Sequence, residues 1–203
     1  MKSVNKTNNN KGFSLVELIV IIAIISIAAG TLALSVSLVV GSEAKKAVQK
    51  IEASLDSAKT GAMSRYSETL TIQYLDKDVS DGRDVAGFYA VETIETLKKG
   101  TGTTPVDHRT VGKEQRRLCD ARVDMVLTYD DGGSSASTTI EKDGSNSFIF
   151  EYDRGTGLFK NVGIGDSSGG VTYYGQPISL ECTSGLRTYK IKFLPETGKH
   201  VRE

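Results

Sequence analysis

The sequence is poor in the residues on which most enzyme chemistry depends. Its 203 residues include two histidines and two cysteines, and we find no nucleophile, acid pair or metal-ligand cluster at a usable spacing. His108 and His200 are isolated in polar surroundings, and neither cysteine has a histidine close by in the sequence. This scarcity argues against an enzyme and gives no reason to expect a bound cofactor.

An excess of charge of one sign is also missing, since the chain has 25 basic and 25 acidic residues. The densest basic cluster consists of Lys113, Arg116, Arg117 and Arg122. Acidic residues interrupt this cluster, and we find no basic stripe elsewhere. Direct binding of nucleic acid is therefore not supported by the sequence.

Charged residues and proline are both absent from one long segment near the N-terminus. No charged residue occurs between Leu18 and Val40, and the first proline of the chain is Pro105. At a rise of about 1.5 Å per residue, a helix over this segment would be about 34 Å long, enough to cross a bilayer core of about 30 Å. From Gly41 onward the sequence is polar and interrupted by glycine, so we expect no second membrane span.

The residues before this apolar segment predict its orientation. The opening stretch, MKSVNKTNNNKG, contains Lys2, Lys6 and Lys11 and no acidic residue. Because short basic flanks tend to stay in the cytoplasm, we expect a single pass with everything after Val40 exported.

One acidic residue, Glu17, stands at the start of the apolar segment. An isolated carboxylate costs about 3 kcal/mol in the middle of a bilayer, so its presence calls for a compensating interaction. An ordinary secretory signal would end at Ala28-Ala29-Gly30, but the apolar run continues to Val40. A plain membrane anchor explains the length of the run and does not explain the glutamate.

The stretch KGFSLVEL, at residues 11–18, resembles the class III signal of type IV prepilins and pseudopilins. The resemblance implies that a prepilin peptidase cuts between Gly12 and Phe13 and then N-methylates Phe13. The leader, residues 1–12, would be lost, whereas the transmembrane and assembly helix, residues 13–40, would remain on the mature protein.

The same resemblance implies a role for Glu17 in assembly. In a filament of packed helices, Glu17 of one subunit would pair with the terminal amine of Phe13 on a neighbour. Two unit charges about 4 Å apart gain about 4 kcal/mol at an effective dielectric constant of about 20, which offsets the burial of the carboxylate. The alternative left open is that Glu17, close to the helix end, only reaches the lipid headgroups.

Beyond the apolar segment we expect the helix to continue over residues 41–66. Apolar residues recur there at intervals of three or four, which is the spacing of one face of a helix. The stripe consists of Ala44, Val48, Ile51, Leu55, Ala58, Ala62 and Tyr66. Its small alanines suit close packing of a sheet against the helix.

From residue 67 onward, apolar residues alternate with polar ones, which predicts half-buried strands. The clearest alternations lie at residues 70–74, 123–129, 148–152 and 189–193, and the glycine-containing turns DDGGSS, DRGTG and SGL separate strands. LPETG predicts a turn before a short terminal strand, and GIGDSSGG predicts a flexible loop.

These patterns together predict an α+β protein, with a long N-terminal helix packed on an antiparallel β-sheet head at residues 67–203. The resemblance to prepilins implies the same architecture, the type IV pilin-like fold.

The two cysteines, Cys119 and Cys182, lie in the part that we expect to be exported. Each flanks an expected strand, which permits a disulfide without requiring one. Such a bond would stabilise the fold by about 4 kcal/mol. Two free thiols are the alternative.

An acidic segment partly matches a calcium-binding loop. It contains Asp76, Asp78, Asp81 and Asp84. Its glycine is one place away from the EF-hand position and the twelfth position lacks glutamate, so we expect no metal and keep calcium only as an alternative.

The function that follows is a structural subunit, a minor pilin or pseudopilin of a type IV pilus or a type II secretion-like filament. The partners implied by the resemblance are the prepilin peptidase, other pilin or pseudopilin subunits and the inner-membrane assembly platform. The subunit would sit in the cytoplasmic membrane with its head outside and then enter an extracellular or envelope-spanning filament. The alternative is that the same anchor displays the head as an adhesin or DNA-binding module.

Overall fold

The computed structural model describes residues 14–64, 67–76, 85–98 and 107–203, without the side chains of residues 31–40, 67–68, 94–98 and 107–113. The contacts between residues divide the chain into two units, Met1–Leu38 and Val39–Glu203.

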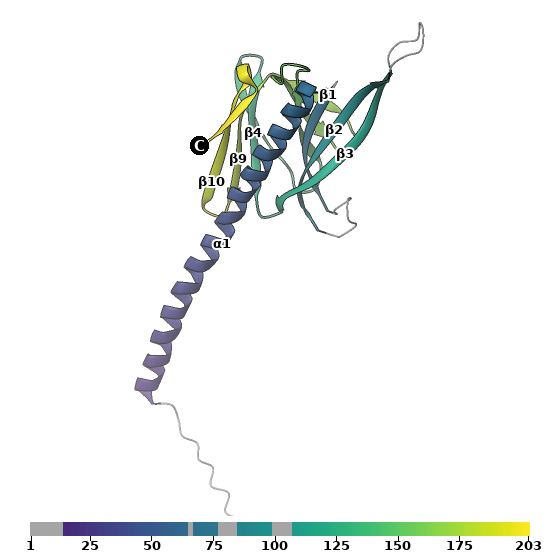
Figure 1. Cartoon of the computed structure of the whole chain (residues 1–203). Helices are drawn as coiled ribbons and strands as arrows, with labels where there is room; N and C mark the ends of the chain where they lie inside the picture. Colours follow the sequence, from purple (N-terminus) through teal and green to yellow (C-terminus); the bar gives the residue numbers. More distant parts are fainter. Residues whose placement is uncertain (1–13, 65–66, 77–84, 99–106) are drawn as a thin grey trace, which may run out of the picture. The chain divides into compact units, whose positions relative to one another are not determined.

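One helix, α1, spans Leu15–Ser64 and contributes to both units (Figure 1). Between Leu15 and Ile27, every large apolar side chain is at least 42% exposed. A helix that is apolar on all sides needs a lipid or protein environment to cover it. The first unit of the chain therefore leaves its apolar surface without cover from its own residues.

In the second unit, α1 buries one face. The buried side chains are Ala44, Ala47, Val48, Ile51, Leu55, Ala58 and Ala62, each fully inaccessible to solvent. This confirms the stripe predicted from the sequence, except that Tyr66 lies outside the described residues. Alanine at four of these seven positions lets the helix backbone approach the strands closely.

The strands follow one another from residue 67 to the C-terminus. They are β1 (Ser67–Leu75), β2 (Gly87–Lys98), β3 (Asp107–Asp120), β4 (Asp124–Asp131), β5 (Ser134–Thr139), β6 (Asn146–Tyr152), β7 (Phe159–Asp166), β8 (Val171–Tyr174), β9 (Pro177–Ser184), β10 (Arg187–Leu194) and β11 (Lys199–Arg202). A short 3-10 helix, η1 (Pro195–Thr197), separates the last two.

Two antiparallel sheets make up the described part of the head. The first has six strands in the order β3-β2-β1-β6-β7-β8, and the second has five in the order β11-β10-β9-β4-β5. The structure is thus α+β, as predicted, but the strands divide between two sheets where the sequence pattern led us to expect one.

An aromatic cluster joins the two sheets. Phe193 of β10 lies 5.5 Å from Phe150 of β6 and 5.2 Å from Phe159 of β7, measured between ring centroids. Tyr152 extends the cluster, with its ring 4.8 Å from that of Phe159. Burying each such ring contributes about 2 to 3 kcal/mol, so the cluster is a main source of cohesion between the sheets.

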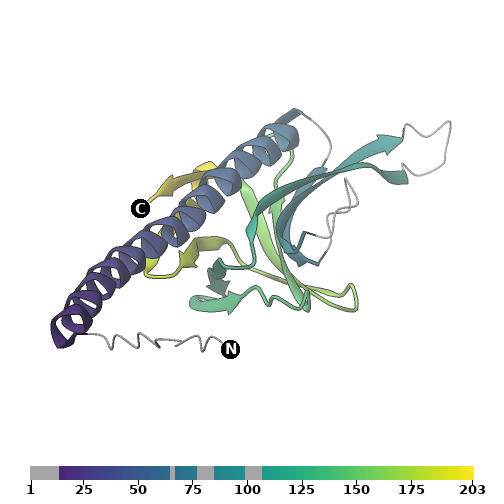
Figure 2. The same ribbon diagram turned by 90° about the horizontal axis from the view of Figure 1, so that it is seen from below.

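The second half of α1 lies between the two sheets, with β10 and β11 on one flank and β2 and β3 on the other (Figures 1 and 2). On the first flank Arg202 pairs with Glu52. On the other, Lys50 donates a hydrogen bond of 3.0 Å to the backbone carbonyl of Arg117. In the buried interior of the head, the hydroxyl of Tyr152 donates a hydrogen bond of 3.2 Å to the backbone carbonyl of Leu55.

The four alternating segments predicted as strands correspond to β1, β4, β6 and β10, and each of the three predicted turns joins two strands. LPETG forms the predicted turn, with η1 followed by Gly198 in the left-handed conformation and then by β11. The loop predicted for GIGDSSGG is wrong in part, because residues 163–166 complete β7.

Candidate functional site

The residues of the N-terminal signal lie at the start of α1. Gly12 and Phe13, the expected processing site, lie outside the described residues. Glu17 is exposed in the first turn of the helix, where the amide of Leu18 donates to the carbonyl of Ser14 at 3.1 Å. A carboxylate in the first turn interacts favourably with the positive end of the helix dipole. The start of the helix is therefore a favourable place for the carboxylate of Glu17.

Only part of the expected membrane span has described side chains. Among the described residues, no helix is long and apolar enough to cross a membrane. The side chains of residues 31–40, which belong to the expected span, lie outside the described residues.

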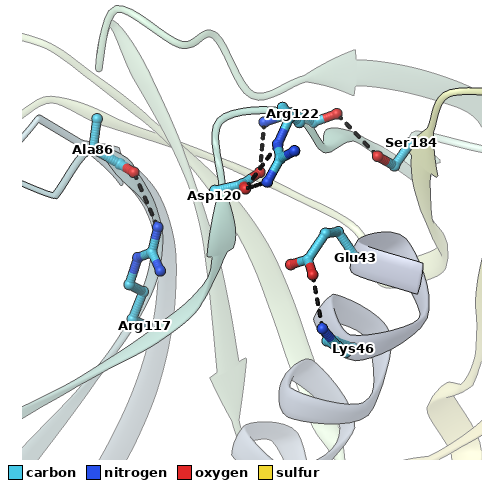
Figure 3. A network of polar contacts seen from close by, with 7 residues as sticks. All are labelled: Glu43, Lys46, Ala86, Arg117, Asp120, Arg122 and Ser184. Carbon is cyan, nitrogen blue, oxygen red and sulfur yellow. Dashed lines mark hydrogen bonds and ion pairs between the residues drawn. The ribbon is translucent and has the colours of Figure 1, made fainter. Parts of the chain in front are cut away.

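A polar network occupies the end of the head at which α1 enters it (Figure 3). Glu43 forms an ion pair with Lys46, one turn later on the helix, with 2.8 Å between Oε1 of Glu43 and Nζ of Lys46. On the turn between β3 and β4, the Nε of Arg122 donates to Asp120 at 2.9 Å. Ser184, at the end of β9, donates to the backbone carbonyl of Arg122 at 3.3 Å.

The charges of this network stabilise one another. Hydrogen bonding from Arg122 holds the pKa of Asp120 below its ordinary value. The same bond, together with the charges of Asp120 and Glu43, raises the pKa of Arg122. All these groups are at least partly solvated, so the network fixes local geometry more than it adds stability.

The basic cluster found in the sequence is only partly assembled in space. Arg116 pairs with Glu114 at 3.1 Å and Arg122 pairs with Asp120. Lys113 has no described side chain. A shallow pocket of about 220 Å³ between α1 and β3 is lined by Lys50, Ala53, Ser54, Arg116, Arg117 and Leu118. Of the cations at its rim, Arg116 pairs with Glu114, while Lys50 and Arg117 donate hydrogen bonds to backbone carbonyls.

The two cysteines are brought into the same buried core from different sheets, Cys119 from β3 and Cys182 from β9. Both are free thiols in the structure. Burial raises the pKa of Cys119 to about 12, and burial together with the proximity of Cys119 raises that of Cys182. A nucleophilic or metal-binding role needs an accessible thiolate, which this environment disfavours. The disulfide stays a proposal.

Metal-binding groups do not converge in the described part of the chain, where no cluster of three or more histidine, cysteine, aspartate or glutamate side chains occurs. Of the acidic segment kept as an alternative calcium site, Asp78, Asp81 and Asp84 lie outside the described residues. His200 stands 4.0 Å from Asp56 across α1 and β11.

A buried carboxylate that the sequence did not single out lies between α1 and β2. Glu92 is 3% exposed, and one of its oxygens accepts a hydrogen bond of 3.1 Å from the hydroxyl of Ser57. Its other oxygen, Oε1, has no partner among the described residues. No sequence signal distinguishes Glu92 from the exposed glutamates around it, because its burial depends on where α1 crosses the sheet.

Comparison with known families matches one segment of the chain. The family model for the prokaryotic N-terminal methylation motif matches residues 7–33. The N-terminal segment is therefore a type IV prepilin-like class III signal peptide, as its resemblance predicted, and the motif is one of structural proteins of pilin type. No curated protein sequence and no solved structure matches the chain.

Proposed function

We propose that the prepilin-like signal makes this protein a structural subunit of a type IV pilus or a type II secretion-like filament, in the role of a minor pilin or pseudopilin. The observation that carries the proposal is the methylation motif at residues 7–33, which leads directly into an exposed apolar helix. The α+β head that follows fits the type IV pilin-like fold.

The proposed maturation starts with prepilin peptidase, which cuts between Gly12 and Phe13 and methylates the new N-terminus. The apolar part of α1 then anchors the subunit in the cytoplasmic membrane with the head outside. An assembly platform passes the subunit into the filament, where neighbouring subunits cover the apolar side chains that this chain leaves exposed.

Glu17 acts in this scheme as the residue that sets the stagger between subunits. Its carboxylate pairs with the terminal amine of a neighbouring subunit, and burial between apolar helices makes an unpaired carboxylate costly. Only one axial offset brings the two charges together, so the pair selects that offset.

The decisive experiment replaces Glu17 in the full chain. Glu17→Val should be cleaved normally and enter filaments at least about tenfold less than the native chain, since a loss of 1.4 kcal/mol in pairing already changes an equilibrium about tenfold. Glu17→Asp keeps the charge and is the matched control. Unimpaired incorporation of Glu17→Val, measured by immunoblotting of sheared filaments, contradicts the role in assembly.

Maturation has a separate readout. Mass spectrometry of the mature N-terminus should find methylated phenylalanine from position 13. A mature chain that starts near Thr31, just after the place where an ordinary secretory signal would end, would contradict the filament subunit and indicate a released protein.

A further inference from the structure

The turn between β9 and β10 displays a leucine to solvent. Arg187 pairs with Ser184, so Gly185 and Leu186 form a two-residue turn. Gly185 has φ of +60°, while Leu186 does not have a positive φ, which fits a type II′ turn. The second position of such a turn commonly holds a polar residue, yet Leu186 is here and is 93% exposed.

This turn lies at the end of the head from which the apolar part of α1 departs. A Cβ atom on Gly41 would lie 2.5 Å from Cδ of Arg187, so the arginine side chain packs against the helix at that glycine. Gly41 follows directly on Val40, the last residue of the uncharged segment. Ser184, at the start of the turn, is hydrogen bonded to Arg122 (Figure 3).

The surface around Leu186 carries more positive than negative charge. Arg187 follows Leu186 in the chain and packs at Gly41, Lys45 comes one helical turn after Gly41, and Lys46 and Arg122 belong to the polar network beside Ser184; all four are exposed. The acids nearby include Glu43, Asp120 and Asp124, which pair with Lys46, Arg122 and Lys142 and leave Lys45 and Arg187 without a described acidic partner. An apolar side chain surrounded by basic ones is the composition of protein surfaces that rest on anionic membranes.

We propose that Leu186 and the basic residues around it dock on the surface of an anionic phospholipid bilayer before the subunit is assembled. The inference rests on the proposed function, because the membrane anchor is what brings a bilayer to Gly41. The leucine inserts at the level of the headgroups and the cations interact with lipid phosphates. The docked face then holds the head in one orientation on the membrane.

A single exposed leucine elsewhere on the head would need no such explanation. Leu194 is one example, 39% exposed at the other end of β10. In an extended strand it lies about 26 Å from Leu186, too far to share one contact with a membrane surface. Position relative to Gly41, together with the surrounding charge, is what distinguishes Leu186.

The chain contains no tryptophan, so a single introduced tryptophan reports on its own surroundings. Leu186→Trp in the full-length chain, reconstituted into phosphatidylcholine vesicles with and without phosphatidylglycerol, is the test. We expect a blue-shifted emission and strong quenching by brominated lipids, both greater with phosphatidylglycerol. Leu194→Trp is the matched control and should stay unshifted and unquenched.

A second variant tests the contribution of charge. Arg187→Glu in the Leu186→Trp background should abolish the dependence on phosphatidylglycerol, and its circular dichroism should match that of the parent. Persistent dependence on this lipid in the Arg187→Glu variant overturns the electrostatic part of the proposal.

Three outcomes overturn the inference. If Leu186→Trp is quenched no more than Leu194→Trp while the chain resists extraction by carbonate, the docking fails and the proposed function stands. If the emission shifts only in assembled filaments, Leu186 contacts a neighbouring subunit and not lipid. If carbonate releases the chain from the vesicles, the anchor itself fails, and both proposals fall.

Discussion

The contact between Ser57 and Glu92 places a buried carboxylate beside a single hydroxyl donor. Glu92 is almost fully buried, and one oxygen of its carboxylate accepts a hydrogen bond from Ser57, whereas the other has no partner among the described residues. A buried charge pays a desolvation penalty that few partners offset here. The removal of that donor should therefore cost more than an average side-chain hydrogen bond.

We expect Ser57→Ala to lower the free energy of unfolding by about 1 to 3 kcal/mol, because it leaves the carboxylate of Glu92 without a donor. Glu92→Gln in the same background should recover much of this loss by removing the charge. Urea unfolding of the full chain in detergent, followed by near-ultraviolet circular dichroism, measures both. Ser64→Ala is the control, since its exposed hydroxyl bonds only within α1. An equal loss in that control contradicts the prediction.

The two thiols provide a second prediction at the scale of residues. With a pKa raised to about 12, Cys119 is a thiolate in only about one molecule in ten thousand at pH 8. Iodoacetamide should therefore leave both cysteines of the native chain unmodified, and modification should rise only as the pH approaches the raised pKa. Mass spectrometry gives the readout, and rapid labelling of the native chain at pH 8 would rule out this burial.

The same labelling in denaturant tests the proposed disulfide. Chains purified from the exported fraction and denatured without a reductant should carry no label on Cys119 or Cys182 if the bond forms. Two labelled cysteines would leave the thiols free, as they are in the structure.

Among the elements, the helix and the strands with an apolar alternation were predictable. The stripe from Ala44 to Ala62 has helical spacing, and β1, β4, β6 and β10 each present alternate apolar side chains to the core. The apolar side chains of these elements are buried against the rest of the head, so the observed burial agrees with the pattern in the sequence.

The strands β2, β5 and β8 could not be predicted, because their sequences show no regular apolar alternation. All residues of β5 but one are serine or threonine, and the strand is held by pairing with β4 and by hydroxyl contacts such as Thr128 with Ser137. The four residues of β8 are too few to show a period. In β2, Tyr89 and Glu92 are both buried although they face opposite sides of the sheet, so the alternation is lost.

Glycine at the junction of η1 and β11 provides a prediction at the scale of elements. Gly198 has φ of +59°, and a Cβ there would collide with the backbone carbonyl of Gly157. Gly132 has φ of +67° with open space around it. We expect Gly132→Ala to cost about 1 kcal/mol and Gly198→Ala about 3 kcal/mol of unfolding free energy. Equal costs would show that the close approach of the two glycines contributes nothing.

At the scale of the whole molecule, the proposed maturation keeps the anchor attached to the head. The methylation motif at residues 7–33 overlaps the start of α1, so the proposed cut between Gly12 and Phe13 would remove a basic leader and leave α1 on the mature chain. The prepilin-like signal could be predicted from residues 11–18, because the motif combines several residue types at fixed spacing. The contact partners of the head could not, since they depend on other chains.

Gly12→Val should block processing and leave a precursor that keeps Lys2, Lys6 and Lys11 in the membrane fraction. A mass spectrum of that fraction shows the full precursor or the shortened chain. Gly30→Val is the matched control, because an added side chain there meets nothing within 4 Å and should leave cleavage unchanged. Normal maturation of Gly12→Val contradicts the assignment of the cleavage site.

The bonds between α1 and the strands also have a mechanical consequence. They are spread along the helix, at Lys50, Glu52 and Leu55. A force pulling on the second half of α1 along its axis would load them in parallel, as shear, and they would have to break together. A force across the axis would open them one after another. The head should therefore tolerate tension along this part of the helix far better than tension across it.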